Sequence, residues 1–225
     1  PTNYSLTVTG SLTNYGTITD NVNDFYLNIS GNLANNGIWT NYSTTLNGNG
    51  NQEMSMSQPF GCANLTRNPG IGRAKATSGL SFIGTNITLY DTLEFTTGNS
   101  ISMSGGSFNY GVMYKSALPA IQLTAGNGTY ASAFTIDAVM TELNGSLLIY
   151  GNSNIFKGHI VNYGTLRNNS PTNYTLNVTG SLTNSGTITD NVNDFYLNIS
   201  GNLTNNGTWT NHSTTLNGNG NQELS

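Results

Sequence analysis

The sequence predicts an all-β protein whose chain coils as a parallel β-helix, or β-solenoid, with about 20 residues per turn. Residues 1–55 return as residues 171–225, at an offset of 170 and with seven differences among the 55 positions. Within this duplicated block, a shorter pattern recurs at intervals of about 20 residues. Its short runs alternate apolar and polar residues, which is the pattern of half-buried strands. Strand-sized runs that recur at a fixed interval indicate turns of chain stacked on one another.

The shorter pattern can be followed residue by residue. The run LTVTGSLTN begins at Leu6, LNISGNLAN begins at Leu27, and a third run begins at Leu46. Glycine or Asn-Gly follows each strand-like run, as expected for tight turns. Short second strands are expected at residues 17–19 and 38–40. Because the asparagines recur at the turns, we expect their side-chain amides to stack as ladders.

The duplication divides the chain into two parts. Residues 1–170 are interpreted as one complete solenoid unit, and residues 171–225 as the start of the next unit, continuous with the first. An irregular loop is expected at about residues 54–79, which hold two of the five prolines, the single cysteine and half of the basic residues. The sequence is interpreted as a window of a longer array, in which each unit has about eight turns and advances the axis by roughly 40 Å.

Two other folds explain less of the pattern. A β-sandwich would also have strands every 8–12 residues, but it gives no reason for the 20-residue interval. Disorder would suit a chain in which only 7% of residues are charged. The regular alternation, together with 12 Tyr, 8 Phe and 2 Trp residues, favours a packed core instead.

Composition also limits the function. The net charge is −4, and all six basic residues lie outside the duplicated block, so no nucleic-acid partner is expected. No apolar run is long enough to span a bilayer, and no membrane insertion is expected in this window. A single Cys62 cannot form a disulfide within the chain and is expected to be buried. The Asn/Thr/Gly-rich, charge-poor composition suggests an extracellular, cell-surface location.

The runs GSLTNYGTITDN, GNLANNGIWTN and VNYGTLRNN resemble the G-x-L-x-N-x-G-T runs of large bacterial surface proteins. These include filamentous-haemagglutinin-like adhesins, autotransporter adhesins and giant adhesins of the Bacteroidetes type. The resemblance covers the duplicated block and residues 160–170. It implies export, a right-handed parallel β-helix, and adhesion or filament formation, and it brings no catalytic motif.

The acidic residues are the first candidates for a site. Asp20 and Asp24 lie four residues apart in one Asn-rich turn, and Asp190 and Asp194 repeat them. They are expected to cap the turn. A weak Ca²⁺ site is the alternative, although the EF-hand spacing is absent. Catalysis is not expected, because paired carboxylates must converge across one bond.

The two histidines, His159 and His212, stand apart from other ligand-type residues in the sequence. Tyr42 takes the place of His212 in the first copy, so neither a metal-ligand role nor a general-base role is expected for it. No cofactor is expected. The partner-binding candidates are Arg67, Arg73 and Lys75 in the expected loop, because loops on a rigid scaffold often carry binding groups.

The functional hypothesis is therefore a structural and adhesive protein that forms an elongated surface fibre. Its units would stack on one another and perhaps bundle laterally, and surface glycans or other cells are candidate partners. One alternative is a carbohydrate-active protein of the polysaccharide lyase or depolymerase kind, with a carboxylate-lined groove that contains Asp91, Glu94 and Asp137. Another is an ice-binding solenoid, which would need Thr-x-Thr on the same face in nearly every turn.

Overall fold

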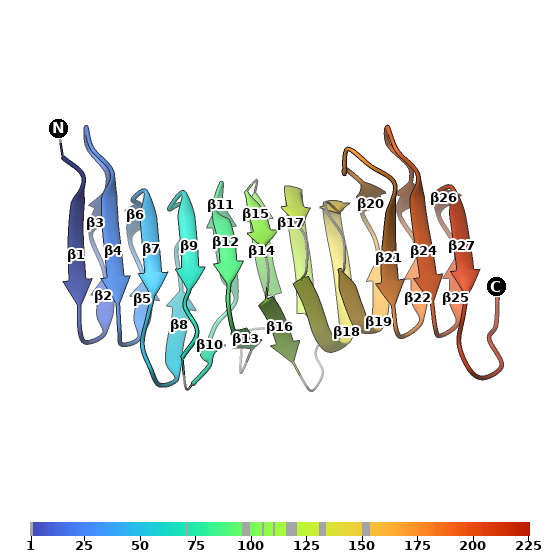
Figure 1. The fold of residues 1–225 in the computed structure, drawn as a ribbon, viewed down its shortest axis with the longest axis horizontal. Helices are drawn as coiled ribbons and strands as arrows, with labels where there is room; N and C mark the ends of the chain where they lie inside the picture. Colours follow the sequence, from blue (N-terminus) through green and yellow to red (C-terminus); the bar gives the residue numbers. More distant parts are fainter. Residues whose placement is uncertain are drawn as a thin grey trace.

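The chain forms a β-solenoid that extends as a rod, with the N- and C-termini at opposite ends (Figure 1). The computed structural model describes residues 2–70, 72–95, 100–104, 106–109, 111–115, 121–130, 134–149 and 154–225. These residues contain strands and turns and no helix, so none of their helices could cross a membrane. The prediction of an all-β solenoid is confirmed.

The strands stack in three parallel rows, and each turn of chain contributes to every row in sequence. Row I contains β1 (Tyr4–Val8), β4 (Phe25–Ile29), β7 (Ser43–Leu46), β9 (Asn64–Arg67), β12 (Asn86–Leu89), β15 (Ser107–Asn109), the ends of β17 (Ile121–Tyr130) and β18 (Phe134–Ile149), β20 (Thr165–Asn168), β23 (Thr187–Thr189) and β26 (Thr208–Thr210). Row II contains β2 (Leu12–Asn14), β5 (Leu33–Asn35), β8 (Gln52–Met56), β10 (Ala74–Ala76), β13 (Thr92–Phe95), β16 (Gly111–Lys115), the starts of β18 and β19 (Ile155–Asn162), β21 (Tyr174–Val178), β24 (Phe195–Ile199) and β27 (Ser213–Leu216). Row III contains β3 (Thr17–Thr19), β6 (Ile38–Thr40), a bridge at Phe60, β11 (Leu80–Ile83), β14 (Ser100–Ser104), parts of β17, β18 and β19, β22 (Leu182–Asn184), β25 (Leu203–Asn205) and a bridge at Leu224.

The register gives the length of each turn. In row I, Leu6 pairs with Leu27, Leu27 with Thr44 and Thr44 with Leu65, which are steps of 21, 17 and 21 residues. The 17-residue step recurs in the second copy, where Leu197 pairs with Thr214. Most turns therefore have 21 or 22 residues, close to the predicted 20, and one short turn belongs to each copy.

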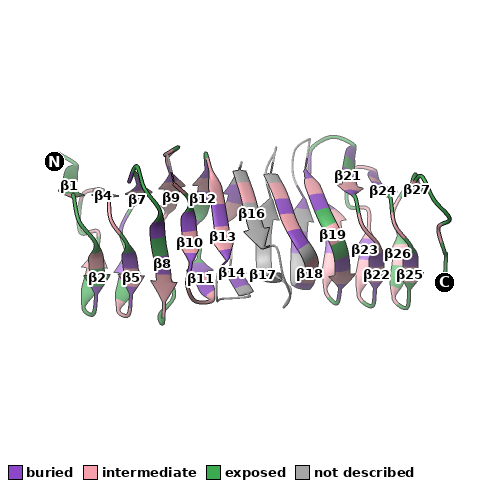
Figure 2. Cartoon of the chain, turned by 90° about the horizontal axis from the view of Figure 1, so that it is seen from below, coloured by how far each residue is buried: buried purple, intermediate pink, exposed green. Residues whose placement is uncertain are grey.

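The core consists of columns of inward side chains, one from each turn. Because side chains alternate across a strand, every second residue enters the coil, as the buried bands in Figure 2 show. One column of row I runs through buried Leu27, Thr44, Leu65, Ile87 and Phe108. Burial of each large apolar side chain stabilises the coil by about 1.5–3 kcal/mol.

Asparagine ladders hold the corner between rows II and III. The Asn14 side-chain amide donates to Asn35 Oδ1 at 3.0 Å in the first copy. In the second copy, Asn162 donates to Asn184 and Asn184 donates to Asn205, both at 2.8 Å. The predicted amide stacking is thus confirmed.

The segment predicted as an irregular loop, residues 54–79, continues the coil instead. It contains β9 and β10, which pair with the turns on either side. The prediction failed because Arg67, Ala74 and Ala76 take the inward positions here, so the alternation of large apolar residues that marks the other strands is missing.

The two copies of the duplicated block begin in different rows. β1 begins the first copy in row I, whereas β21 begins the second copy in row II. β20 is the ninth strand of row I, so β21 comes eight turns and one row after β1. Figure 1 nevertheless shows β21 on the same side of the rod as β1, with β20 behind it. The rows therefore wind around the axis by about one row over the length of a unit, in the way that stacked strands twist.

Candidate metal centre

The repeated acidic turn joins row I to row II of the next strand pair. In the second copy, residues 190–194 link β23 to β24, and Asp190 Oδ1 accepts a hydrogen bond from the Phe195 backbone N–H at 2.7 Å. In the first copy, Asp20 Oδ1 accepts the same bond from Phe25 at 2.8 Å. The first aspartate of each turn therefore closes the turn, because its carboxylate substitutes for a backbone acceptor.

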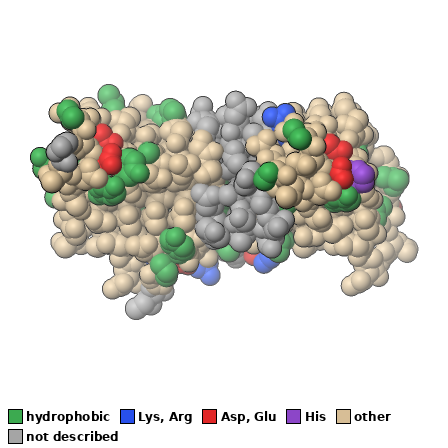
Figure 3. All heavy atoms as spheres, turned by 45° about the horizontal axis from the view of Figure 1, so that its top comes forward, with side chains coloured by type: hydrophobic (Ala, Val, Ile, Leu, Met, Phe, Trp, Pro, Cys, Tyr) green, Lys and Arg blue, Asp and Glu red, His purple; other side chains and the backbone are tan. Residues whose placement is uncertain are grey.

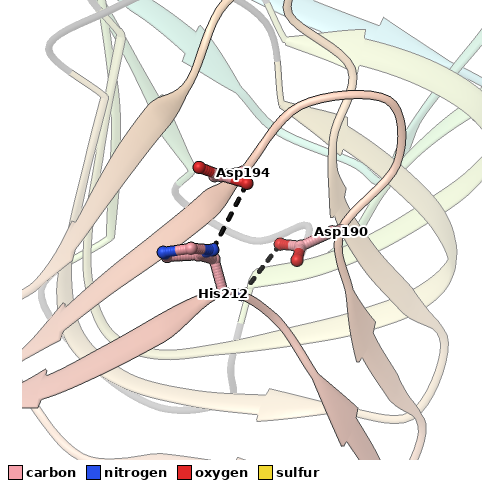
Figure 4. Close-up of side chains that lie close together, drawn as sticks. All are labelled: Asp190, Asp194 and His212. Atoms are coloured by element: carbon pink, nitrogen blue, oxygen red, sulfur yellow. Dashed lines mark hydrogen bonds and ion pairs between the residues drawn. The ribbon is translucent and has the colours of Figure 1, made fainter.

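The short turn of the second copy brings a histidine to this position. Tyr196 pairs with Ser213, so His212 lies one layer along the rod from Phe195, beside both aspartates. The His212 backbone N–H donates to Asp190 Oδ1 at 2.9 Å, and His212 Nδ1 lies 3.3 Å from Asp194 Oδ1 (Figure 4). One ligand atom from each of the three residues lies within 4.8 Å of the others.

Neighbouring side chains orient Asp194 and His212. Asp194 Oδ2 accepts hydrogen bonds from Asn173 Nδ2 at 3.0 Å and from the Tyr196 hydroxyl at 3.1 Å. The Tyr196 and His212 rings lie with their centroids 5.0 Å apart. Desolvation, and secondly the hydrogen bond to Asp194, raises the pKa of Tyr196. The His212 side chain is 50% exposed, so the cluster opens to solvent.

The prediction that both histidines are isolated is wrong for His212. Sequence separation hid the cluster, because His212 follows Asp194 by 18 residues and becomes its neighbour only through the 17-residue turn. The recurring pattern of the runs was the signal that could have found it. His159, by contrast, uses its Nδ1 to accept a hydrogen bond from the Ser181 backbone N–H at 3.2 Å.

The first copy has the same turn without the histidine. Asp24 Oδ2 accepts a hydrogen bond from Asn3 at 3.3 Å, as Asp194 does from Asn173. Tyr42 takes the place of His212 and packs edge-on against Tyr26, with centroids 5.3 Å apart. Figure 3 shows acidic side chains near both ends of one face of the rod, with a histidine beside one of the two groups.

The three basic residues predicted to bind a partner do not form an exposed group. Arg67 is completely buried, and its guanidinium donates to the carbonyls of Gly48 and Gly72 and to Gln52 Oε1 at 3.0–3.1 Å. Burial lowers the pKa of Arg67, and Asp91, 3.7 Å away, opposes that shift. As a partner-binding candidate Arg67 is wrong, because its donors hold backbone inside the coil.

The other two basic residues belong to a column of charges along row II. Lys75 pairs in register with Glu53 on one side and Glu94 on the other. Arg73 forms an ion pair with Glu94 at 3.2 Å. These residues lie on the outer face, where opposite charges on adjacent layers compensate one another.

The central carboxylates of the proposed groove are likewise matched to cations. Asp91 lies against Arg67, Glu94 against Arg73, and Asp137 against Lys157 at 2.9 Å. Each pair joins adjacent layers of the coil. These carboxylates therefore face basic side chains of neighbouring turns, which is the arrangement of cross-strand ion pairs.

The chain matches no protein-family model, no curated protein and no solved structure. The arguments for function accordingly come from the coil and from the chemistry of its side chains.

Proposed function

We propose that this chain is a rod segment of an extracellular surface fibre, built from tandem solenoid units and used for adhesion. The observation that carries the proposal is the backbone pairing across the boundary between the two copies. β20 pairs with β18 before the boundary and with β23 after it, and β21 pairs with β19 and β24. Units joined in this way add length without a hinge, which is what a fibre requires.

The repeated turns support the adhesive part of the proposal. Their tips carry Val22 and Val192, which are 83% and 87% exposed. Open hollows of about 380 and 450 Å³ adjoin the tips of the first and second turn. Both turns lie on one side of the rod (Figure 3), and at about 4.8 Å per layer they are roughly 40 Å apart. A surface that repeats at a fixed spacing suits multivalent attachment, in which weak contacts add up.

Electron imaging of the native full-length protein tests the rod. We expect a thin fibre with layers about 4.8 Å apart and a longer period of roughly 40 Å. Antibody labelling of intact source cells tests the location, and we expect the surface to be stained without permeabilisation. Compact particles, or beads on flexible linkers, would contradict the rod, and staining that needs permeabilisation would contradict the surface location.

The ice-binding alternative gains little from the geometry. Thr40 donates to Thr19 and Thr210 donates to Thr189, each at 2.9 Å. Gly61 takes the next place after Thr40 in its column, and Arg167 pairs with Thr189 on the other side. These threonine columns thus end after two turns, whereas a flat ice-binding surface needs many.

A further inference from the structure

We propose that Asp190, Asp194 and His212 form a binding site for a divalent transition metal ion, with Zn²⁺ as the best match. The site lies at the corner between rows I and II, where two layers of the coil meet (Figure 4). It does not depend on the proposed fibre function.

The donor set selects the class of metal. Two carboxylates and one imidazole are ligands that Zn²⁺, Co²⁺ and Ni²⁺ accept. Ca²⁺ instead takes six to eight oxygen ligands, and an imidazole nitrogen at the centre of the cluster is unsuited to it. The histidine therefore distinguishes this site from the calcium site considered for the aspartates alone.

The spacing fits a tetrahedral ion. Ligands about 2.0–2.1 Å from a tetrahedral centre lie roughly 3.3 Å from each other. His212 Nδ1 and Asp194 Oδ1 are 3.3 Å apart, and the donor atom of Asp190 lies within 4.8 Å of both. Binding then needs a small movement of the Asp190 carboxylate, and because the site is half open to solvent, water can supply the fourth ligand.

The ligands are already held by hydrogen bonds from outside the cluster. Asp190 Oδ1 is fixed by two backbone N–H groups, and Asp194 Oδ2 by Asn173 and Tyr196. Such outer contacts orient ligands and reduce the ordering that binding requires. Asp194 Oδ1 and His212 Nδ1 are left facing one another, and without a metal this pair is an exposed contact of small energetic value.

The duplicated sequence supplies matched controls. The first copy has Asp20 and Asp24 in an equivalent turn but Tyr42 in place of the histidine. His212→Tyr therefore installs a residue that this turn already accepts elsewhere in the chain. Conversely, Tyr42→His gives the first copy all three ligands.

Calorimetric titration of the tag-free 225-residue chain with ZnCl₂ tests the proposal, with Co²⁺ absorption as a report of coordination. We expect one equivalent bound by the unaltered chain, at least a tenfold loss of affinity in His212→Tyr, and a second equivalent in Tyr42→His. His159→Gln should bind as the unaltered chain does. The proposal is overturned if His212→Tyr keeps its Zn²⁺ affinity, if CaCl₂ binds as tightly as ZnCl₂, or if His159→Gln abolishes binding.

Discussion

Replacing Asn184 by alanine tests whether the asparagine ladder stabilises the coil. Asn184 is completely buried and is the middle member of the ladder of three. Its amide donates to Asn205 Oδ1 at 2.8 Å and to the Thr208 carbonyl at 3.0 Å, and its Oδ1 accepts from Asn162 and from the Gly186 backbone N–H. Alanine removes all four bonds at once.

The expected cost follows from which partners lose their bonds. Asn162 Nδ2 keeps the carbonyls of Thr187 and Gly164 at 3.2 and 3.3 Å, so it loses little. The Gly186 N–H and the Thr208 carbonyl each lose a partner, at about 1–3 kcal/mol for a buried group. We therefore expect Asn184→Ala to lower the free energy of unfolding by about 2–4 kcal/mol.

The matched control is Asn205→Ala at the exposed end of the same ladder, where water replaces the lost bonds and about 1 kcal/mol or less is expected. Urea unfolding followed by circular dichroism gives the free-energy difference. Because solenoids can open segment by segment, hydrogen exchange of the Gly186 amide should be measured too, and it should accelerate in Asn184→Ala. Equal stabilities of the two variants, with unchanged exchange at Gly186, would refute the ladder's role.

Three further predictions concern other parts of the coil. Arg67→Met should cost about 2–4 kcal/mol, because buried carbonyls lose their donor, whereas the exposed Arg73→Met should cost about 1 kcal/mol or less; similar unfolding midpoints for both would count against a structural Arg67. Gly186→Ala should cost about 1–3 kcal/mol, since the new Cβ would meet the Gly164 carbonyl of the preceding layer, while Gly16→Ala, the same position in the first copy, has nothing within 4 Å and should be nearly neutral; thermal unfolding compares the two, and a neutral Gly186→Ala would contradict the close stacking. Burial raises the pKa of Cys62 to about 12, so the folded thiol should resist alkylation at pH 8, and the stability due to its neutral form should be complete below the unfolded pKa of about 8.5 and be lost as pH rises toward 12; rapid labelling of the folded chain at pH 8 would show that the thiol is accessible.

The repeated parts of the fold could be predicted because each turn rewrites the same local rules. Alternation at Leu27 and Ile29 marks the buried face of a strand, and the recurring asparagines mark the corners. The step of about 20 residues then follows from counting. Rows II and III could not be distinguished in this way, because their short strands differ mainly in which neighbour they pair with.

The prediction failed where an inward position breaks the apolar rule. Arg67 occupies a place between Leu46 and Leu89 in its column, and only the backbone carbonyls around it make a buried guanidinium acceptable. The metal cluster was missed for another reason. His212 and Asp194 meet through a turn of unusual length, and a single sequence does not reveal which turn is shortened.

The shift of one row per unit has a consequence for any longer array. Taken alone, the extra row would rotate each copy by about a third of a revolution, so that successive tips would point outward like the steps of a spiral staircase. The opposite winding of the rows cancels this rotation, and the tips align like the teeth of a comb. Adding units would then raise the number of contacts available to one flat target without turning any of them away from it. A unit lengthened by a single strand and corner would lose that alignment even if every layer still paired.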